Sequence, residues 1–145
     1  MQKRVGIARA LIATPDLILY DEPTTGLDAA TSTTISRLMR EVQLKNPGLT
    51  AITITHDYLS AGLIADRVLY LDQGTGKLQE VLSRAKIKRI REEAKDQEQV
   101  AVSKIRHLLE KFFSAGNLSE RSGVRDKKEQ TWLEAFGAVL GAMFK

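Results

Sequence analysis

The run Leu17–Tyr20 most constrains the fold, because it is continuously apolar and ends abruptly in Asp21, Glu22 and Pro23. A short apolar run without polar alternation is typical of a strand that is covered on both faces, as in a parallel sheet. Proline cannot donate a hydrogen bond to a strand ladder, so Pro23 ends the pairing. We therefore expect a buried strand with two carboxylates at its carboxyl end.

The segments around this strand alternate between helical and strand patterns. A turn-like stretch after Pro23 leads to Asp28, which can cap the next helix. The alternation predicts an α/β fold whose parallel strands are joined by right-handed crossovers. The expected elements are a helix over residues 3–13, a helix after Asp28 with a buried stripe of Ile35, Leu38, Met39 and Val42, a strand over Ala51–Thr55, a short helix over Tyr58–Ala65, a strand over Arg67–Leu71 and a turn at Gly74–Gly76.

Beyond residue 78 the pattern becomes helical. Apolar residues recur three, four or seven apart from Ile87 to Phe112, which predicts one long helix or a helix pair packed on the core or on a second copy. We divide the chain into an α/β part (1–78), a helical extension (79–113), a linker rich in Ser, Gly and charge (114–128) and a C-terminal amphipathic helix (129–145).

Composition narrows the function classes. The chain has no cysteine, which excludes disulfides, zinc–thiolate sites and a thiol nucleophile. Its longest apolar stretch, Ala135–Phe144, is about half of what a bilayer span needs. Residues 86–91 contain four basic side chains, but acidic residues follow at once, and such mixed charge is typical of a solvated helix face. We expect no nucleic-acid partner.

Asp21 and Glu22 form the first part of a candidate site. Adjacent residues at a strand end point in different directions, so one carboxylate can hold Mg²⁺ through water while the other polarises an attacking water. A pair of solvated acids that ends a strand is the structural alternative. His56 follows the next expected strand, and the carboxyl ends of neighbouring parallel strands open onto one crevice. This position favours a functional role for His56.

Four sequence blocks together resemble the C-terminal half of an ABC-transporter ATPase. They are Gln2–Leu11, Leu17–Pro23, Thr25–Asp28 and Thr55–Asp57, in that family's order and at about its spacing. The resemblance covers residues 1 to about 80. It implies a P-loop NTPase-type parallel sheet with a C-terminal α-helical extension, ATP and Mg²⁺ as cofactors, and phosphoryl transfer to water.

The resemblance also implies a role for each site residue. Asp21 resembles the Walker B aspartate that holds the metal ion, and Glu22 resembles the catalytic glutamate that activates water. His56 matches the switch histidine that contacts the γ-phosphate. Asp28 matches the D-loop aspartate, which in the family lies at the nucleotide-binding interface between two ATPase subunits.

This chain departs from the family pattern on its N-terminal side. It holds no G-x-x-x-x-G-K-[ST] loop to cradle phosphates, no glutamine loop and no Leu-Ser-Gly-Gly signature. We therefore expect a partial ATPase domain that lacks the Walker A half, present as a fragment of a longer subunit. The 145-residue chain alone is expected not to hydrolyse ATP.

The resemblance implies an ATP-binding subunit of an ABC transporter. Such a subunit pairs with a second ATP-binding subunit and with membrane permease subunits, peripherally on the cytoplasmic face of the membrane. The first residues, Met1–Val5, resemble Mla-type subunits, which move lipids. Two alternatives stay open: a catalytically inactive fragment that regulates an intact ATPase, and an ABC-type ATPase of DNA repair.

Overall fold

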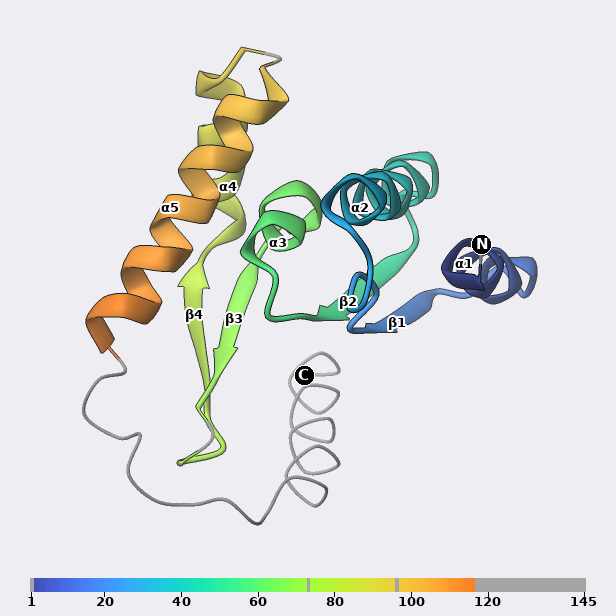
Figure 1. The fold of residues 1–145 in the computed structure, drawn as a ribbon, viewed down its shortest axis with the longest axis horizontal. Coiled ribbons are helices and arrows are strands. Elements are labelled where there is room, and N and C mark those ends of the chain that lie inside the picture. The colour runs from blue at the N-terminus through green and yellow to red at the C-terminus, as the bar shows by residue number, and fades with distance from the viewer. Residues whose placement is uncertain (1, 73, 96, 117–145) are drawn as a thin grey trace.

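A computed structural model describes residues 2–72, 74–95 and 97–116, and Figure 1 shows their arrangement. The described chain is a mixed α/β structure with a short parallel sheet. Its elements are α1 (Gln2–Ile12), β1 (Leu17–Asp21), α2 (Ala29–Lys45), β2 (Thr50–Ile54), α3 (Tyr58–Ile64), β3 (Val68–Leu71), β4 (Leu78–Leu82), α4 (Arg84–Glu93) and α5 (Glu98–Gly116).

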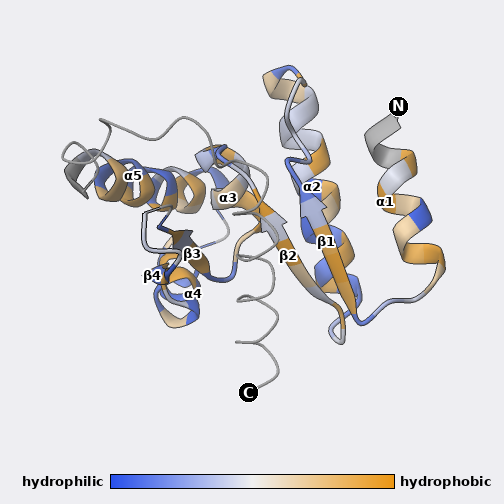
Figure 2. Cartoon of the chain, turned by 90° about the horizontal axis from the view of Figure 1, so that it is seen from below, coloured by the Kyte–Doolittle hydropathy of each residue, from blue (hydrophilic) through white to orange (hydrophobic). Residues whose placement is uncertain are grey.

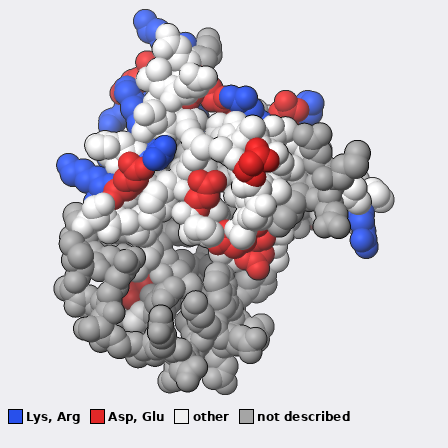
Figure 3. Space-filling model, in the orientation of Figure 1, with Lys and Arg blue, Asp and Glu red and all other residues white. Residues whose placement is uncertain are grey.

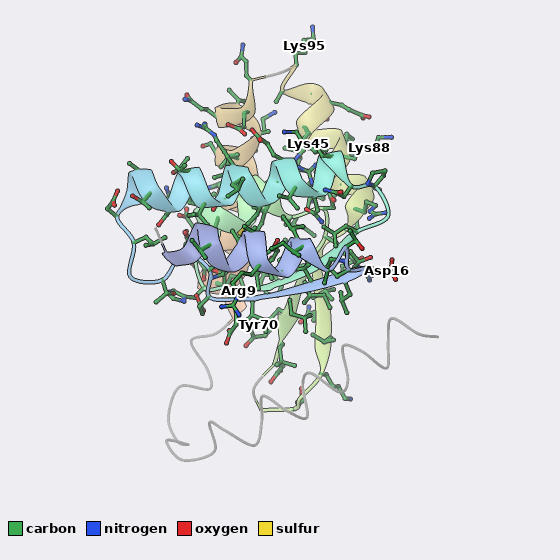
Figure 4. The ribbon with its side chains drawn as sticks, turned by 90° about the vertical axis from the view of Figure 1, so that its right-hand side faces the viewer. Arg9, Asp16, Lys45, Tyr70, Lys88 and Lys95 are labelled. Atoms are coloured by element: carbon green, nitrogen blue, oxygen red, sulfur yellow. The ribbon has the colours of Figure 1, made fainter. Side chains whose placement is uncertain are left out.

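Strands β1 and β2 form the parallel pair that the sequence predicts. Leu17 lies opposite Thr50 and Asp21 opposite Ile54, so the two strands end together. The amide of Glu22 donates to the Ile54 carbonyl at 2.9 Å and extends the ladder by one residue. Whatever follows β1 and β2 is therefore held at the same edge of the sheet. Figure 4 labels Asp16 and Lys45, which lie toward the opposite end, before β1 and at the end of α2.

One face of this sheet departs from expectation. Ile18 and Tyr20 of β1 are buried against Ile7 of α1 and residues of α2, whereas Leu19 between them is 45% exposed. Within the described residues, then, β1 is covered on one face, and the expected cover on both faces is not seen. Helices α1 and α2 pack toward the same apolar cluster, which leaves Leu19 on the other side. Figure 2 shows the hydrophobic colour that runs along β1.

The third expected strand does not join the parallel sheet, so that part of the prediction is wrong. Instead of extending the parallel sheet, β3 pairs antiparallel with β4 in a second two-stranded sheet (Figure 1). Strand β4 falls in the segment expected to begin the helical extension. The turn between the two strands forms around Asp72, whose Oδ1 accepts from the amides of Gly74 and Thr75 at 2.8 and 3.0 Å. This local turn favours hairpin closure over a parallel crossover.

The extension is a helix pair, one of the two predicted arrangements. Helices α4 and α5 bury Ile87, Ile90, Ile105 and Leu109 in a cluster that also contacts Tyr58 at the start of α3. The extension therefore packs on the α/β part, as the periodicity predicts. Helix α5 continues to Gly116, past the start of the expected linker. The rest of that linker and the expected C-terminal helix (129–145) lie outside the described residues.

Ion pairs and hydrogen bonds of charged side chains connect this helix pair to the core. Arg40 of α2 and Arg91 of α4 both donate to Oδ1 of Asp66, at 2.9 and 3.0 Å. Arg91 also donates to the carbonyls of Leu63 and Ala65, at 3.2 and 2.8 Å. Burial lowers the pKa of Arg91, and the neighbouring Arg40 adds to that effect. One carboxylate thus joins α2 to α4 through two arginines.

The basic run of α4 is largely matched by acids. Lys88 and Arg89 form ion pairs with Glu92 and Glu93, one turn further on, in keeping with a solvated helix face. Figure 3 shows Lys and Arg around the outer end of the α4–α5 pair, beside acidic side chains. No helix among the described residues is long and apolar enough to cross a membrane.

Candidate functional site

The loop after β1 places its carboxylates through an unusual backbone conformation. Glu22 has a φ of 43°, in the left-handed region, which non-glycine residues adopt at a cost. Its carbonyl accepts from the Thr25 amide at 3.3 Å, and Gly26, with a φ of 78°, completes the turn. Pro23 is buried. The chain therefore reverses sharply at the strand end, and strain at such a position is common at functional sites.

Glu22 and His56 meet at the carboxyl edge of the sheet. Nδ1 of His56 lies 2.8 Å from Oε1 of Glu22, and the Thr25 hydroxyl donates to Oε2 at 2.9 Å. The His56 side chain is 79% exposed and that of Glu22 is 32% exposed, so the pair opens to solvent. The hydrogen bond to Glu22 raises the pKa of His56, and the negative charge of Glu22 adds to this effect. The structure thus brings together two of the residues that the sequence singles out.

Asp21 faces a different space from Glu22. It is exposed and borders an open groove of about 620 Å³, whose lining also includes Leu19 of the same strand, Ile7 of α1 and Gly26. The two adjacent carboxylates therefore serve different surroundings. Among the described residues, no group of three or more His, Cys, Asp and Glu side chains is placed to hold a metal ion.

Asp28 acts within its own helix as the N-cap of α2. Its Oδ1 accepts from the amides of Ala30 and Thr31, at 3.1 and 3.0 Å, and its Oδ2 accepts from the Thr31 hydroxyl at 2.6 Å. These hydrogen bonds from Thr31 lower the pKa of Asp28. The sequence predicts this cap, and the interface role of Asp28 stays a prediction.

A set of buried hydroxyl groups lies beneath the site, and the sequence patterns do not predict it. Ser36 of α2 and Ser60 of α3 are 0% and 2% exposed, and Thr24 in the loop after β1 is 5% exposed. A signal for the α2 members was present. Ser32 and Ser36 continue the helical spacing of Ile35 and Met39, but a search for apolar residues passes over serine.

Comparisons with known proteins match about half of this chain. The molybdenum import ATP-binding protein ModC of Mycobacterium tuberculosis is 48% identical over 73 residues, which are 50% of this chain and 20% of ModC. The homologues are ATP-binding subunits of ABC transporters. The arginine transport ATP-binding protein ArtM of Bacillus subtilis is 44% identical over 73 residues, which are 50% of this chain and 30% of ArtM. An aliphatic sulfonates import ATP-binding protein, SsuB of Albidiferax ferrireducens, is 40% identical over 85 residues, 59% of this chain and 30% of SsuB.

The chain thus spans between a fifth and three-tenths of the length of these relatives. No family model matches it. The match to ATP-binding transport proteins agrees with the resemblance carried by the four sequence blocks.

Proposed function

We propose that this chain is part of the ATP-binding subunit of an ABC transporter, and that Asp21, Glu22 and His56 belong to its ATP-hydrolysing site. The contact of 2.8 Å between Glu22 and His56 carries this proposal. It gathers a carboxylate and an imidazole at the carboxyl edge of a parallel sheet, where ligands of such sheets bind. The homologous ATP-binding proteins supply the reaction class.

Asp21 suits a magnesium ion that is shared with a nucleotide. Mg²⁺ in ATPases is bound through one or two carboxylates, several waters and the substrate's phosphates rather than by an all-protein cage. A single exposed carboxylate, without a cluster of three ligands among the described residues, fits that donor set. The ion, when bound, neutralises charge that develops on the phosphates. Asp21 is the residue that would hold it.

Glu22 and His56 would act side by side, Glu22 on the reacting water and His56 on the phosphate. Glu22 accepts a hydrogen bond from the water and orients it toward the phosphate. Because the Glu22 carboxylate is an acceptor only, Nδ1 of His56 donates to it, and Nε2 is the ring atom that meets the phosphate. The raised pKa of His56 favours the doubly protonated ring, which also donates from Nε2.

A segment exchange tests this assignment. In ArtM, the segment that is homologous to this chain is replaced by the matching segment of this chain. ArtM then supplies the rest of the subunit. The chimera should release phosphate from ATP, and Glu22→Gln should keep ATP binding while it lowers turnover by roughly 10²-fold. Thr34→Ala, which removes an exposed hydroxyl that bonds within α2, is the matched control. Unchanged turnover in Glu22→Gln would remove Glu22 from the mechanism.

The 145-residue chain by itself gives a second test. Since it carries no phosphate-cradling loop of the G-x-x-x-x-G-K-[ST] type, we propose that it does not hydrolyse ATP alone. Steady Mg²⁺-dependent phosphate release by the pure chain, abolished by Glu22→Gln, would contradict this proposal. If the chain instead binds an intact ATP-binding subunit and alters its turnover, the regulatory alternative is favoured.

We further propose that the whole subunit pairs with a second ATP-binding subunit, in part through Asp28, and docks on permease subunits at the cytoplasmic face of the membrane. The relatives' names give molybdenum, arginine and aliphatic sulfonates as their cargoes. Because these cargoes differ, the segment that the relatives share with this chain does not indicate which substrate is transported. Lipid transport of the Mla type rests on Met1–Val5 and is tested by co-purification with permease subunits and analysis of bound lipid.

A further inference from the structure

We propose that the buried hydroxyl groups of Thr24, Ser60 and Ser36 are positioning residues that hold Glu22 against His56. The oxygens of Ser36 and Ser60 lie 2.7 Å apart, and the Ser60 hydroxyl donates to Oγ1 of Thr24 at 3.4 Å. Each hydroxyl has a single proton to donate. Ser36 therefore donates to Ser60 and Ser60 to Thr24, in one chain of hydrogen bonds that we call the hydroxyl chain.

The hydroxyl chain joins the three elements that meet below the site. Thr24 lies two residues after Glu22, and Ser60 lies four residues after His56, in the first turn of α3. Ser36 contributes from α2, the helix that begins where the Glu22 loop ends. A second, longer contact lies at the same junction: the Ser32 hydroxyl donates to the Thr24 carbonyl at 3.5 Å. The loop after β1 is thereby tied to both helices, and the loop that carries His56 leads directly into α3.

Polar groups at these positions call for a reason beyond burial. The three side chains are at most 5% exposed, and their neighbours in α2 and α3 include Ile35, Met39 and Leu63. Burying a hydroxyl group costs free energy, and its hydrogen bond does no more than offset that cost. Apolar residues would therefore fill these positions equally well. Hydrogen bonds are directional and fix distances more narrowly than apolar contacts do. The hydroxyl chain thus sets the spacing of α2, α3 and the loop after β1.

Glu22 needs such support because of its backbone. A residue with a φ of 43° stays in that conformation only when the surrounding structure holds it there. Its side chain contacts the imidazole of His56, which is 79% exposed. His56 lies in the loop just before α3. A small shift of α3 relative to the loop would separate the two groups. The consequence for hydrolysis rests on the proposed function, whereas the geometry can be tested without it.

The test reads the protonated ring nitrogen of His56 in the 145-residue chain. A carboxylate that accepts from Nδ1 enriches the Nδ1–H tautomer of a neutral ring, and ¹⁵N NMR of the imidazoles measures that fraction. Spectra are recorded at a pH where both histidines are neutral, and exposed His107 on α5 is the internal reference. Glu22→Ala gives the value without the contact. Glu22 and Asp57 are the charged groups that act on the ring.

We expect Ser60→Ala to move the Nδ1–H fraction of His56 at least halfway from the wild-type value to that of Glu22→Ala. Thr24→Val, which exchanges the hydroxyl for a methyl, should do the same, and Thr24→Ser should restore the wild-type value. Thr34→Ala, on the exposed side of α2, should change nothing. Circular dichroism confirms folding, and if Ser60→Ala does not fold, the two Thr24 variants decide.

Wild-type tautomer fractions in folded Ser60→Ala and Thr24→Val would show that the hydroxyl chain only stabilises the fold, and would overturn the proposal. A wild-type His56 without Nδ1–H enrichment would overturn it as well. Neither result depends on ATP hydrolysis. The Glu22→Gln chimera can therefore fail while the hydroxyl chain is upheld, and the reverse also holds.

Discussion

Nδ1 of His56 lies 2.8 Å from Oε1 of Glu22, although the two residues are 34 positions apart in the sequence. Parallel pairing produces this contact, because Asp21 lies opposite Ile54 and both strands end at that rung. Glu22 follows one strand by one residue and His56 follows the other by two. The site is therefore a direct product of the sheet register, and it should report on the integrity of that register.

This contact should make the stability of the fold depend on pH. Glu22 raises the pKa of His56, so the folded chain holds the proton more tightly than the unfolded chain does. The stabilisation is fully present below the ordinary histidine pKa of about 6.5 and is lost as the pH rises through the raised pKa. Urea unfolding of wild type and His56→Gln from about pH 5.5 to 9 should give a stability difference that shrinks with rising pH.

The Glu22→Gln variant is the control for this pH dependence, because it removes the carboxylate whose hydrogen bond and charge raise the pKa of His56. In that background the effect of His56→Gln should vary less with pH than it does in wild type. A difference between wild type and His56→Gln that stays constant over the range would show that the two side chains do not interact in solution.

The backbone of Glu22 gives a second prediction. Its φ of 43° is strained for a residue with a Cβ atom, and glycine relieves that strain. Glu22→Gly and Glu22→Ala both remove the carboxylate, so their difference isolates the backbone. We expect the free energy of unfolding of Glu22→Gly, measured with urea, to exceed that of Glu22→Ala by about 1–2 kcal/mol.

Lys95 supplies the matched position for this comparison. It has the same φ of 43° in the connection between α4 and α5, and Figure 4 labels it there. Lys95→Gly should be more stable than Lys95→Ala by a similar amount. If glycine is no more stable than alanine at either position, the left-handed conformation is not retained in solution.

Asp28 has two roles: it caps α2, and we propose that it lies at a subunit interface. Two substitutions distinguish the capping role from the interface role. Asparagine caps helices about as well as aspartate, whereas alanine does not. Asp28→Ala should therefore lower the Tm, and Asp28→Asn, which keeps the cap but not the charge, should lower it less near neutral pH. The pKa of Asp28 is lowered in the fold, so the stabilisation is present above the ordinary carboxyl pKa and is lost as the pH falls through the lowered one. Equal Tm values for both variants would contradict the capping role.

The sequence was most informative where a local pattern has one structural solution. The apolar run before Asp21 predicts β1, the Asp28 position predicts a cap, and parallel pairing predicts that Glu22 and His56 meet at one edge. Each of these inferences needs only the neighbouring residues or one rule of sheet topology. They are confirmed as geometry, while the chemical roles of the residues remain proposals.

Other features depend on contacts that no local pattern encodes. Strand β3 has the apolar character of a parallel strand, but its partner is set by the turn at Asp72 and by β4, whose sequence contains Gln79 and Glu80. The hydroxyl chain was missed because serine at a helical core spacing looks like a surface residue until its partners are known. Pairing partners and buried polar contacts are tertiary properties.

The helix pair should unfold together with the sheet. Helix α5 places Val102 in the cluster that covers β1 and Ile105 in the cluster beneath α4, so one helix spans both. Ile105 is 0% exposed, and Ile105→Ala should lower the free energy of unfolding by about 2–5 kcal/mol. Val100→Ala, at a site 39% exposed on the same helix, should change it by less than about 0.5 kcal/mol. Hydrogen exchange should then show faster exchange of β1 and β2 amides in Ile105→Ala as well. Faster exchange confined to α4 and α5 would mean that the extension opens as an independent unit.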